Sequence, residues 1–327
     1  MPLHAPGVTD LYHFQYETVK GFFMQSEDGT DDSKFDFMKE NFGLIDRKYG
    51  TEILDEEIAK QHWQSFERYV KRVNEKSADG ESYKVLFLGR HGQGFHNVAE
   101  TKYGTEAWDC YWSLLDGADG VTWSDALLTN VGKQQARDVN ALWKALLPKG
   151  IPAPETYYVS PLTRTLQTAD LSFKDLDLPS DRPYAPIGKE LVREALGVHT
   201  CDRRSTASQI REDFPHVNLE PGFSEPDPLW LPDYREPRSA RNYRLSQFLD
   251  DVFEHDNNAF LSFTSHSGAI ASILAAINHR AFALQTGGVI PVFVKAKRVE
   301  GERKKPPHEP SEGPPPCKEP PAATKAS

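Results

Sequence analysis

The sequence predicts a three-layer α/β/α sandwich around a largely parallel sheet. Short apolar runs that suit buried strands alternate with longer segments of helical periodicity between residues 84 and 296. A proline-rich stretch over residues 173–243 interrupts this alternation. Because prolines break long helices, we expect this stretch to be an irregular insertion near the functional site.

Each element follows from a local pattern. Apolar runs predict strands at residues 84–88, 155–159, 259–264 and 288–296. Periodic or small-residue segments predict helices at residues 129–147, 161–171, 239–254 and 267–277. Thr129 is a suitable N-cap for the first of these helices, and Pro148 ends it.

The two ends of the chain differ from the middle. Residues 1–80 are expected to form an N-terminal extension to a catalytic unit at residues 81–298, and the spacing over residues 51–74 predicts a helix lying on a core. Residues 299–327 are rich in Pro, Lys and Glu and contain few apolar side chains. We therefore predict that this tail is disordered.

Composition excludes several function classes. The net charge of −10 and the pI of about 5.6 argue against a nucleic-acid or anionic-membrane partner. No signal-peptide pattern opens the chain and no apolar run reaches the roughly 20 residues of a membrane span, so the cytoplasm is expected, with nuclear entry left open. Cys110, Cys201 and Cys317 have no metal-ligand spacing and are expected to be free thiols in a reducing compartment.

One motif indicates chemistry. Arg90 and His91 follow the apolar run 85–88, at the carboxyl end of a predicted strand, where open α/β sheets form ligand crevices. A guanidinium can hold a phosphate by two hydrogen bonds, and a neutral imidazole can attack phosphorus. Such a pair also occurs in plain solvated loops. The dinucleotide fingerprint is a weaker alternative, because Asn97 stands where its third glycine is needed.

Four segments, in this order, resemble the signature of the histidine phosphatase superfamily, the phosphoglycerate-mutase-like proteins. The resemblance covers roughly residues 84–297, and the long leader is similar to that of a fungal branch of the superfamily. The segments are Arg90-His91-Gly92 with Asn97; Leu128-Thr129 with Gly132 and Gln135-Ala136; Ser160-Pro161-Leu162 with Arg164-Thr165 and Gln167-Thr168-Ala169; and Ser265-His266-Ser267-Gly268.

The resemblance implies roles for four residues. His91 is the nucleophile that becomes phosphohistidine, and Arg90, Arg164 and His266 form the phosphate pocket. All four lie just beyond predicted strand ends, so neighbouring parallel strands are expected to bring them together. Taken singly, Arg164 would be a surface ion pair and His266 a buried hydrogen-bonded histidine. A neutral His91 also needs an acceptor for its other ring nitrogen, usually a backbone carbonyl.

The proton donor is expected to be Glu194. It ends a short apolar run, as the acid does in the resembled family, and it would protonate the leaving oxygen and later activate water. The alternative is an exposed glutamate paired with Arg193.

Three further residues are candidates for binding substrate. Asn97 either contacts the phosphoryl group or caps the next helix. Arg203 or Arg204 either contacts a second phosphate or carboxylate of the substrate or pairs with Asp202 and Asp213.

We expect no metal and no cofactor, because His91 and His96 are five residues apart and His199 with Cys201 lacks the second pair that closes a zinc site. The expected partner is a small phosphorylated metabolite.

Three function classes remain open. The first is a phosphatase that hydrolyses a small phosphomonoester through phosphohistidine. The second is a phosphoglycerate-type mutase, although residues 192–197 depart from the Glu-Arg-His-Tyr-Gly pattern of glycolytic mutases. The third is a non-catalytic binding or scaffold protein, against which the presence of the complete residue set argues.

Overall fold

The central sheet of the computed structural model has seven strands among the described residues, 11–49 and 62–321. Their order across the sheet is β1-β9-β2-β8-β5-β6-β7. The strands are β1 (Tyr12–Thr18), β2 (Glu81–Arg90), β5 (Thr156–Val159), β6 (Pro186–Gly188), β7 (Asn218–Leu219), β8 (Phe260–Ser265) and β9 (Val289–Glu300), with a separate hairpin of β3 (Gly117–Ala118) and β4 (Val121–Thr122).

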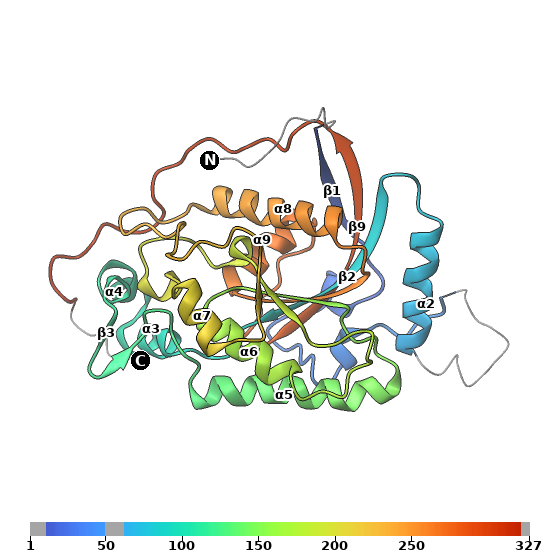
Figure 1. Cartoon of the computed structure of the whole chain (residues 1–327), viewed down its shortest axis with the longest axis horizontal. Helices are drawn as coiled ribbons and strands as arrows, with labels where there is room; N and C mark the ends of the chain where they lie inside the picture. Colours follow the sequence, from blue (N-terminus) through green and yellow to red (C-terminus); the bar gives the residue numbers. More distant parts are fainter. Residues whose placement is uncertain (1–10, 50–61, 322–327) are drawn as a thin grey trace.

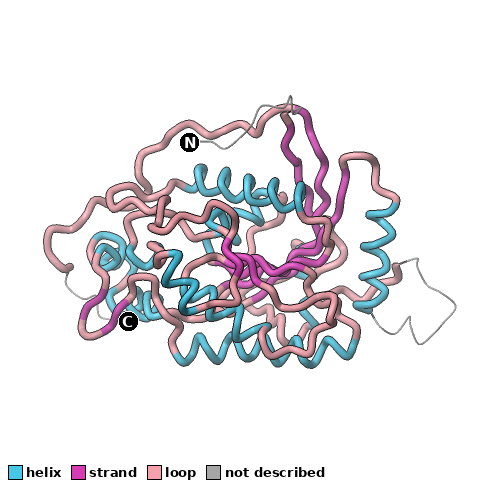
Figure 2. Tube along the Cα trace, in the orientation of Figure 1, coloured by secondary structure: helices cyan, strands magenta, loops and turns pink. Residues whose placement is uncertain are grey.

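Helices cover both faces of this sheet (Figures 1 and 2). They are α2 (His62–Glu75), α3 (Phe95–Tyr103), α4 (Thr105–Cys110), α5 (Asn130–Leu146), α6 (Thr163–Phe173), α7 (Ala207–Asp213), α8 (Arg238–His255) and α9 (Ser267–Ala276). On β2, Leu86 and Leu88 pack with α8 and α9, whereas Val85 and Phe87 pack with α2 and α5. This burial on both faces explains why residues 85–88 of β2 are continuously apolar.

The predicted fold class is confirmed. Strands β2, β8, β5, β6 and β7 are parallel, while β9 runs antiparallel to β2 and to β1. The register sets Arg90 of β2 opposite Ser265 of β8, and Val159 of β5 opposite Thr264. The carboxyl ends of β2, β8 and β5 therefore lie side by side, as the location of the motifs required.

The N-terminal extension is built into the same body. β1 pairs with β9 along its whole length, and Phe22, Phe42 and Phe66 belong to the core that includes Phe87 and Phe293. Helix α2 confirms the second half of the helix predicted over residues 51–74, while residues 51–61 lie outside the described residues. Among the described residues, no packing boundary therefore separates the extension from the unit predicted over residues 81–298.

The C-terminal tail differs from the prediction of disorder. From β9 it runs past α8 to α4 (Figure 1), and Arg303 bonds both carboxylate oxygens of Asp250. Cys110 and Cys317 form a disulfide, so the expectation of three free thiols is wrong for this pair; Cys201 is free and buried. Counting apolar residues missed this docking, because an ion pair and a cross-link hold the tail.

The part of the predicted insertion that precedes α8, residues 174–237, contains only short elements. Besides β6, α7 and β7 it has two 3-10 turns, Glu190–Val192 and Thr200–Asp202. Among the described residues, no helix is both long and apolar enough to cross a bilayer.

Candidate active site

Backbone hydrogen bonds fix the centre of the candidate site. His91, Ser160 and His266 directly follow β2, β5 and β8. The amide of His91 donates to the Ser265 carbonyl at 2.9 Å, and the amide of Ser160 donates to the Thr264 carbonyl at 3.0 Å. The sheet thus continues one residue beyond its strands and holds these side chains close to one another.

His91 is held as a neutral ring. Its Nδ1 lies 2.7 Å from the Gly92 carbonyl oxygen, which only accepts, so Nδ1 carries the proton and Nε2 keeps its lone pair. Burial, reinforced by the charges of Arg164 and Arg90, sets the pKa of His91 well below its usual value. The expected backbone acceptor is therefore present, and the ring is prepared for attack through Nε2.

Two more imidazoles surround His91. The ring centroids of His266 and His96 lie 5.1 Å and 5.3 Å from its own. His266 Nε2 is 2.8 Å from Ser160 Oγ. Burial, then the charge of Arg164, lowers the pKa of both rings, so all three are neutral. Sequence reasoning weighed His96 only as a metal ligand, although its place in the first motif already put it near His91.

Several buried side-chain nitrogens of this candidate site have no hydrogen-bond partner among the described residues. Arg164 is 1% exposed; its Nη2 contacts Asp202 Oδ1 at 2.8 Å, and its Nη1 donates to a backbone carbonyl. The Nε atoms of Arg90 and Arg164 and the Nδ1 atoms of His96 and His266 are buried, and none has a hydrogen-bond partner among the described residues. Such a set of nitrogens suits an anion with several acceptor oxygens.

The other residues of the four motifs position the His91 loop. A Cβ on Gly92 would come within 2.3 Å of the Gly132 carbonyl oxygen, so two glycines are needed where α5 meets the loop. The Gly92 amide donates to Thr168 Oγ1 at 3.0 Å. Asn97 Oδ1 accepts from the Gly94 amide at 2.9 Å. Of the two roles considered for Asn97, the helix cap is therefore the one formed in this structure.

Glu194 reaches the same strand ends from the insertion. Its Oε1 accepts from the Ala195 amide and its Oε2 from the Gly268 amide, each at 2.9 Å. A Cβ on Gly268 would lie 2.1 Å from Glu194 Oε1. The glycine of the fourth motif is thus the docking point of the carboxylate, two residues beyond His266.

Buried arginines hold the segment that carries Glu194. Arg244 of α8 donates to the carbonyls of Leu191, Arg193 and Glu194 at 2.8, 3.0 and 2.9 Å. Arg235 Nη1 donates to the carbonyl of Ala195 at 3.0 Å, on the other side of Glu194. The irregular backbone is therefore fixed by side chains in place of a strand or helix ladder.

The two predicted substrate-binding arginines have protein partners. Arg203 contacts Asp116 Oδ1 at 2.7 Å and is partly exposed. Arg204 is 4% exposed, and its Nε, Nη1 and Nη2 all donate to Glu190 or to backbone carbonyls. Arg204 thus has no donor left for a substrate, and neither arginine pairs with Asp202 or Asp213; Asp202 pairs with Arg164 and Arg235.

One group of side chains is spaced like the ligands of a metal site, but arginines already neutralise its negative charge. Ligand atoms of His199, Cys201 and Asp202 lie within 4.8 Å of one another. Two guanidiniums, of Arg235 and Arg164, already neutralise Asp202 and hold its pKa below the usual range. Because a cation would have to displace both, this group does not fit a metal ion.

Several known proteins have sequences similar to this one. A profile of the histidine phosphatase superfamily (branch 1) matches residues 116–286, which include Arg164, Glu194 and His266. A "Probable phosphoglycerate mutase" of Arthroderma benhamiae is 51% identical over 90% of this chain and 89% of its own length. "Probable phosphoglycerate mutase PMU1" of Saccharomyces cerevisiae is 34% identical over 73% and 86%, and "Phosphomutase-like protein 3" of Candida albicans is 38% identical over 64% and 65%. The chain belongs to the histidine phosphatase superfamily, branch 1, with fungal relatives named as phosphoglycerate-mutase-like proteins.

Proposed function

We propose that this protein is a phosphatase that hydrolyses a small phosphomonoester through a phosphohistidine on His91. The observation that carries the proposal is the unprotonated His91 Nε2 in a cluster where two arginines and two histidines leave buried nitrogens unpartnered. A phosphoryl group supplies the missing acceptor oxygens, and its phosphorus is the electrophile that a neutral imidazole attacks.

The reaction has two steps. In the first, His91 Nε2 forms a bond to phosphorus, the ester P–O bond breaks, and Glu194 gives its proton to the leaving oxygen. In the second, water attacks phosphorus, the P–N bond breaks, and the Glu194 carboxylate takes up a proton from that water. Arg90, Arg164 and His266 would stabilise the charge on the phosphoryl oxygens in both steps.

The experiment is to trap the intermediate. His91→Ala should abolish phosphate release and leave the fold intact, because His91 lies in a loop after β2 and outside the apolar clusters of the core. The wild type should carry acid-labile phosphate during turnover, and His255→Ala, at an exposed position on α8, should behave as wild type. Substantial activity in His91→Ala would overturn the assignment.

The names of the fungal relatives, which are probable phosphoglycerate mutases, favour a mutase as the second candidate function. A mutase must keep the phosphoryl group until the substrate has turned, whereas a phosphatase gives it to water. A panel of phosphorylated metabolites, assayed for both phosphate release and isomer formation, separates the two. Release without isomers supports the phosphatase; isomers formed faster than phosphate is released support the mutase.

A further inference from the structure

A cavity of about 600 Å³ lies beside Glu194. Ala195, the next residue, and Arg241 of α8 are on its inner side, and Arg241 Nη1 is 4.0 Å from Glu194 Oε1. Trp230 lines it from the insertion. Residues 311–316 of the C-terminal tail contribute to its wall. The cavity therefore extends from Ala195, the residue next to Glu194, to the tail.

Of the two arginines that line this cavity, Arg241 makes fewer hydrogen bonds to the protein. Within the described residues its guanidinium makes one hydrogen bond, from Nε to Ser272 Oγ at 3.2 Å. Glu194 does not need it as a partner, because both carboxylate oxygens already accept backbone amides. The other cation, Arg235, is committed to Asp202 and to two carbonyls.

The position of Arg241 also goes against helix electrostatics. It lies in the first turn of α8, near the positive end of the helix dipole, where a cation is disfavoured. Of the cavity's carboxylates, Asp233 and Glu312 are exposed, and Asp109 faces His199 at 3.7 Å. Within the described residues the Nη groups of Arg241 make no hydrogen bond, and the 4.0 Å ion pair of Nη1 with Glu194 leaves them able to bind a ligand's anion next to that carboxyl group.

We infer that this cavity holds the leaving alcohol of the substrate, and that Arg241 binds a second anionic group, a carboxylate or a phosphate, on that alcohol. The inference rests on the proposed function and deepens it by defining the substrate class. Once Glu194 has given up its proton, its carboxylate would repel an anionic alcohol, and the Arg241 charge offsets this repulsion. Arg241 thus takes the role that the sequence suggested for Arg203 or Arg204.

Binding in a His91→Ala background tests the subsite without turnover. The probes are phosphoglycolate, whose alcohol carries a carboxylate, and ethyl phosphate, which has the same length and no second charge. Arg241→Gln should weaken phosphoglycolate binding by about 10- to 100-fold in calorimetric titration and leave ethyl phosphate unchanged. Arg241→Lys, which keeps the charge, should fall between. Arg238→Gln, an exposed arginine on the same helix, is the matched control and should change neither.

The outcomes separate the two proposals. If Arg241→Gln weakens the binding of both probes equally, or of neither, the role of Arg241 is overturned. This holds whether or not the wild type turns substrate over. A selective loss of phosphoglycolate binding supports the subsite even if no phosphohistidine forms, in which case only the phosphatase assignment fails.

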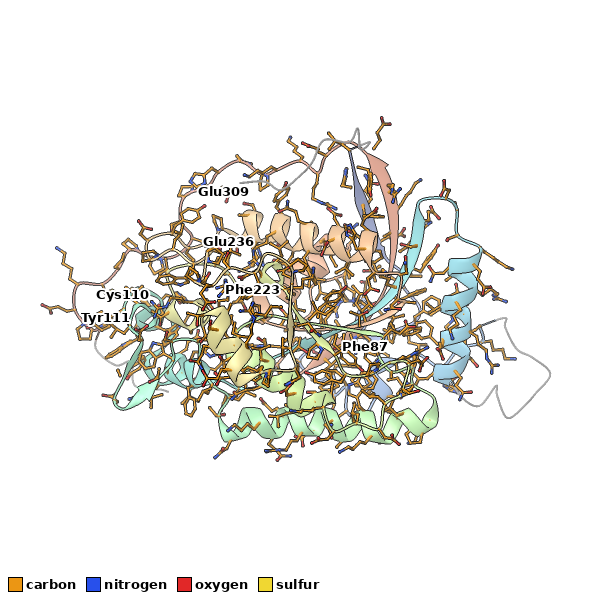
Figure 3. All side chains as sticks on the ribbon, in the orientation of Figure 1. Phe87, Cys110, Tyr111, Phe223, Glu236 and Glu309 are labelled. Carbon is orange, nitrogen blue, oxygen red and sulfur yellow. A yellow bond between two sulfur atoms is a disulfide. The ribbon has the colours of Figure 1, made fainter. Side chains whose placement is uncertain are left out.

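The tail wall has its own test. Cys317 is cross-linked to Cys110, and Glu312 donates its amide to the Arg235 carbonyl at 3.0 Å, so residues 312–317 are anchored at both ends (Figure 3 labels Cys110 near α4). Dithiothreitol would reduce the disulfide to two thiols and become a cyclic disulfide itself. Reduction, or Cys317→Ser, should raise kcat/KM for naphthyl phosphate relative to ethyl phosphate, and the variant should no longer respond to dithiothreitol. An unchanged ratio would show that the tail is not a wall of the substrate site.

Discussion

The two halves of the candidate site are held in place by different means. Arg90, His91 and His266 lie at strand ends, and the register of β8 against β2 and β5 fixes their spacing. Glu194 lies in an irregular segment that depends on buried arginine side chains, chiefly Arg244. The strand-end half therefore uses the fold itself, while the loop half uses contacts that sequence neighbours do not reveal.

The largest expected effect separates the halves directly. If Glu194 is the proton donor, Glu194→Gln should slow hydrolysis of alkyl phosphates by about 10²- to 10⁴-fold, because an alkoxide leaves badly without a proton. Nitrophenyl phosphate should be slowed much less, and phosphohistidine should accumulate on it because water is no longer activated. Steady-state rates on both esters, with quantified trapped phosphate, check this. Equal losses without an intermediate would assign Glu194 to binding or structure.

Arg164 joins the two halves, since it follows β5 and pairs with Asp202 of the insertion. Arg164→Lys should lower kcat/KM on the order of 10²-fold or more, because an ammonium cannot reproduce the planar fork on phosphoryl oxygens. Arg137→Lys, at an exposed position on α5, is the control. Near-normal kinetics for Arg164→Lys would remove Arg164 from the site.

The buried histidines of the strand-end half predict a pH effect on stability. His91, His96 and His266 stay neutral in the folded chain because burial lowers each pKa. In the unfolded chain they take up protons below about pH 6.5, so stability is lost as pH falls through that value. Each contributes up to about 1.4 kcal/mol per pH unit, measurable as the free energy of urea unfolding between about pH 7 and pH 5.

Two variants test whether the buried histidines cause this pH dependence of the free energy of unfolding. His96→Gln should make the pH dependence shallower by one histidine's share, whereas Val131→Ala, at an exposed position of α5 that carries no titratable group, should leave it unchanged. The same slope in both variants would contradict a neutral buried cluster.

The contrast between the halves also explains what the sequence could predict. The strand-end residues were identifiable because each follows an apolar run, and parallel strands share one edge. Glu194 was found by family resemblance, but its docking on Gly268 joins segments 74 residues apart. No local pattern in the helix predicted over residues 239–254 distinguishes Arg241 or Arg244 from its other charged residues. The Cys110–Cys317 disulfide spans 207 residues, and no local pattern encodes such a pairing.

The smallest expected effect concerns the tail, which resembles the loop half in being held by side chains. Arg303 bonds both oxygens of Asp250 at 2.8 and 2.7 Å and donates to the Phe14 carbonyl, so it ties the tail to α8 and β1. Arg303→Ala should lower the free energy of urea unfolding by about 1–2 kcal/mol, since hydrogen bonds to a half-buried carboxylate are lost. Lys304→Ala, the exposed neighbour, should have no effect. If the two variants unfold alike, the disulfide and the hydrogen bonds of residues 309–312 to Tyr234 and Arg235 hold the tail without a contribution from Arg303.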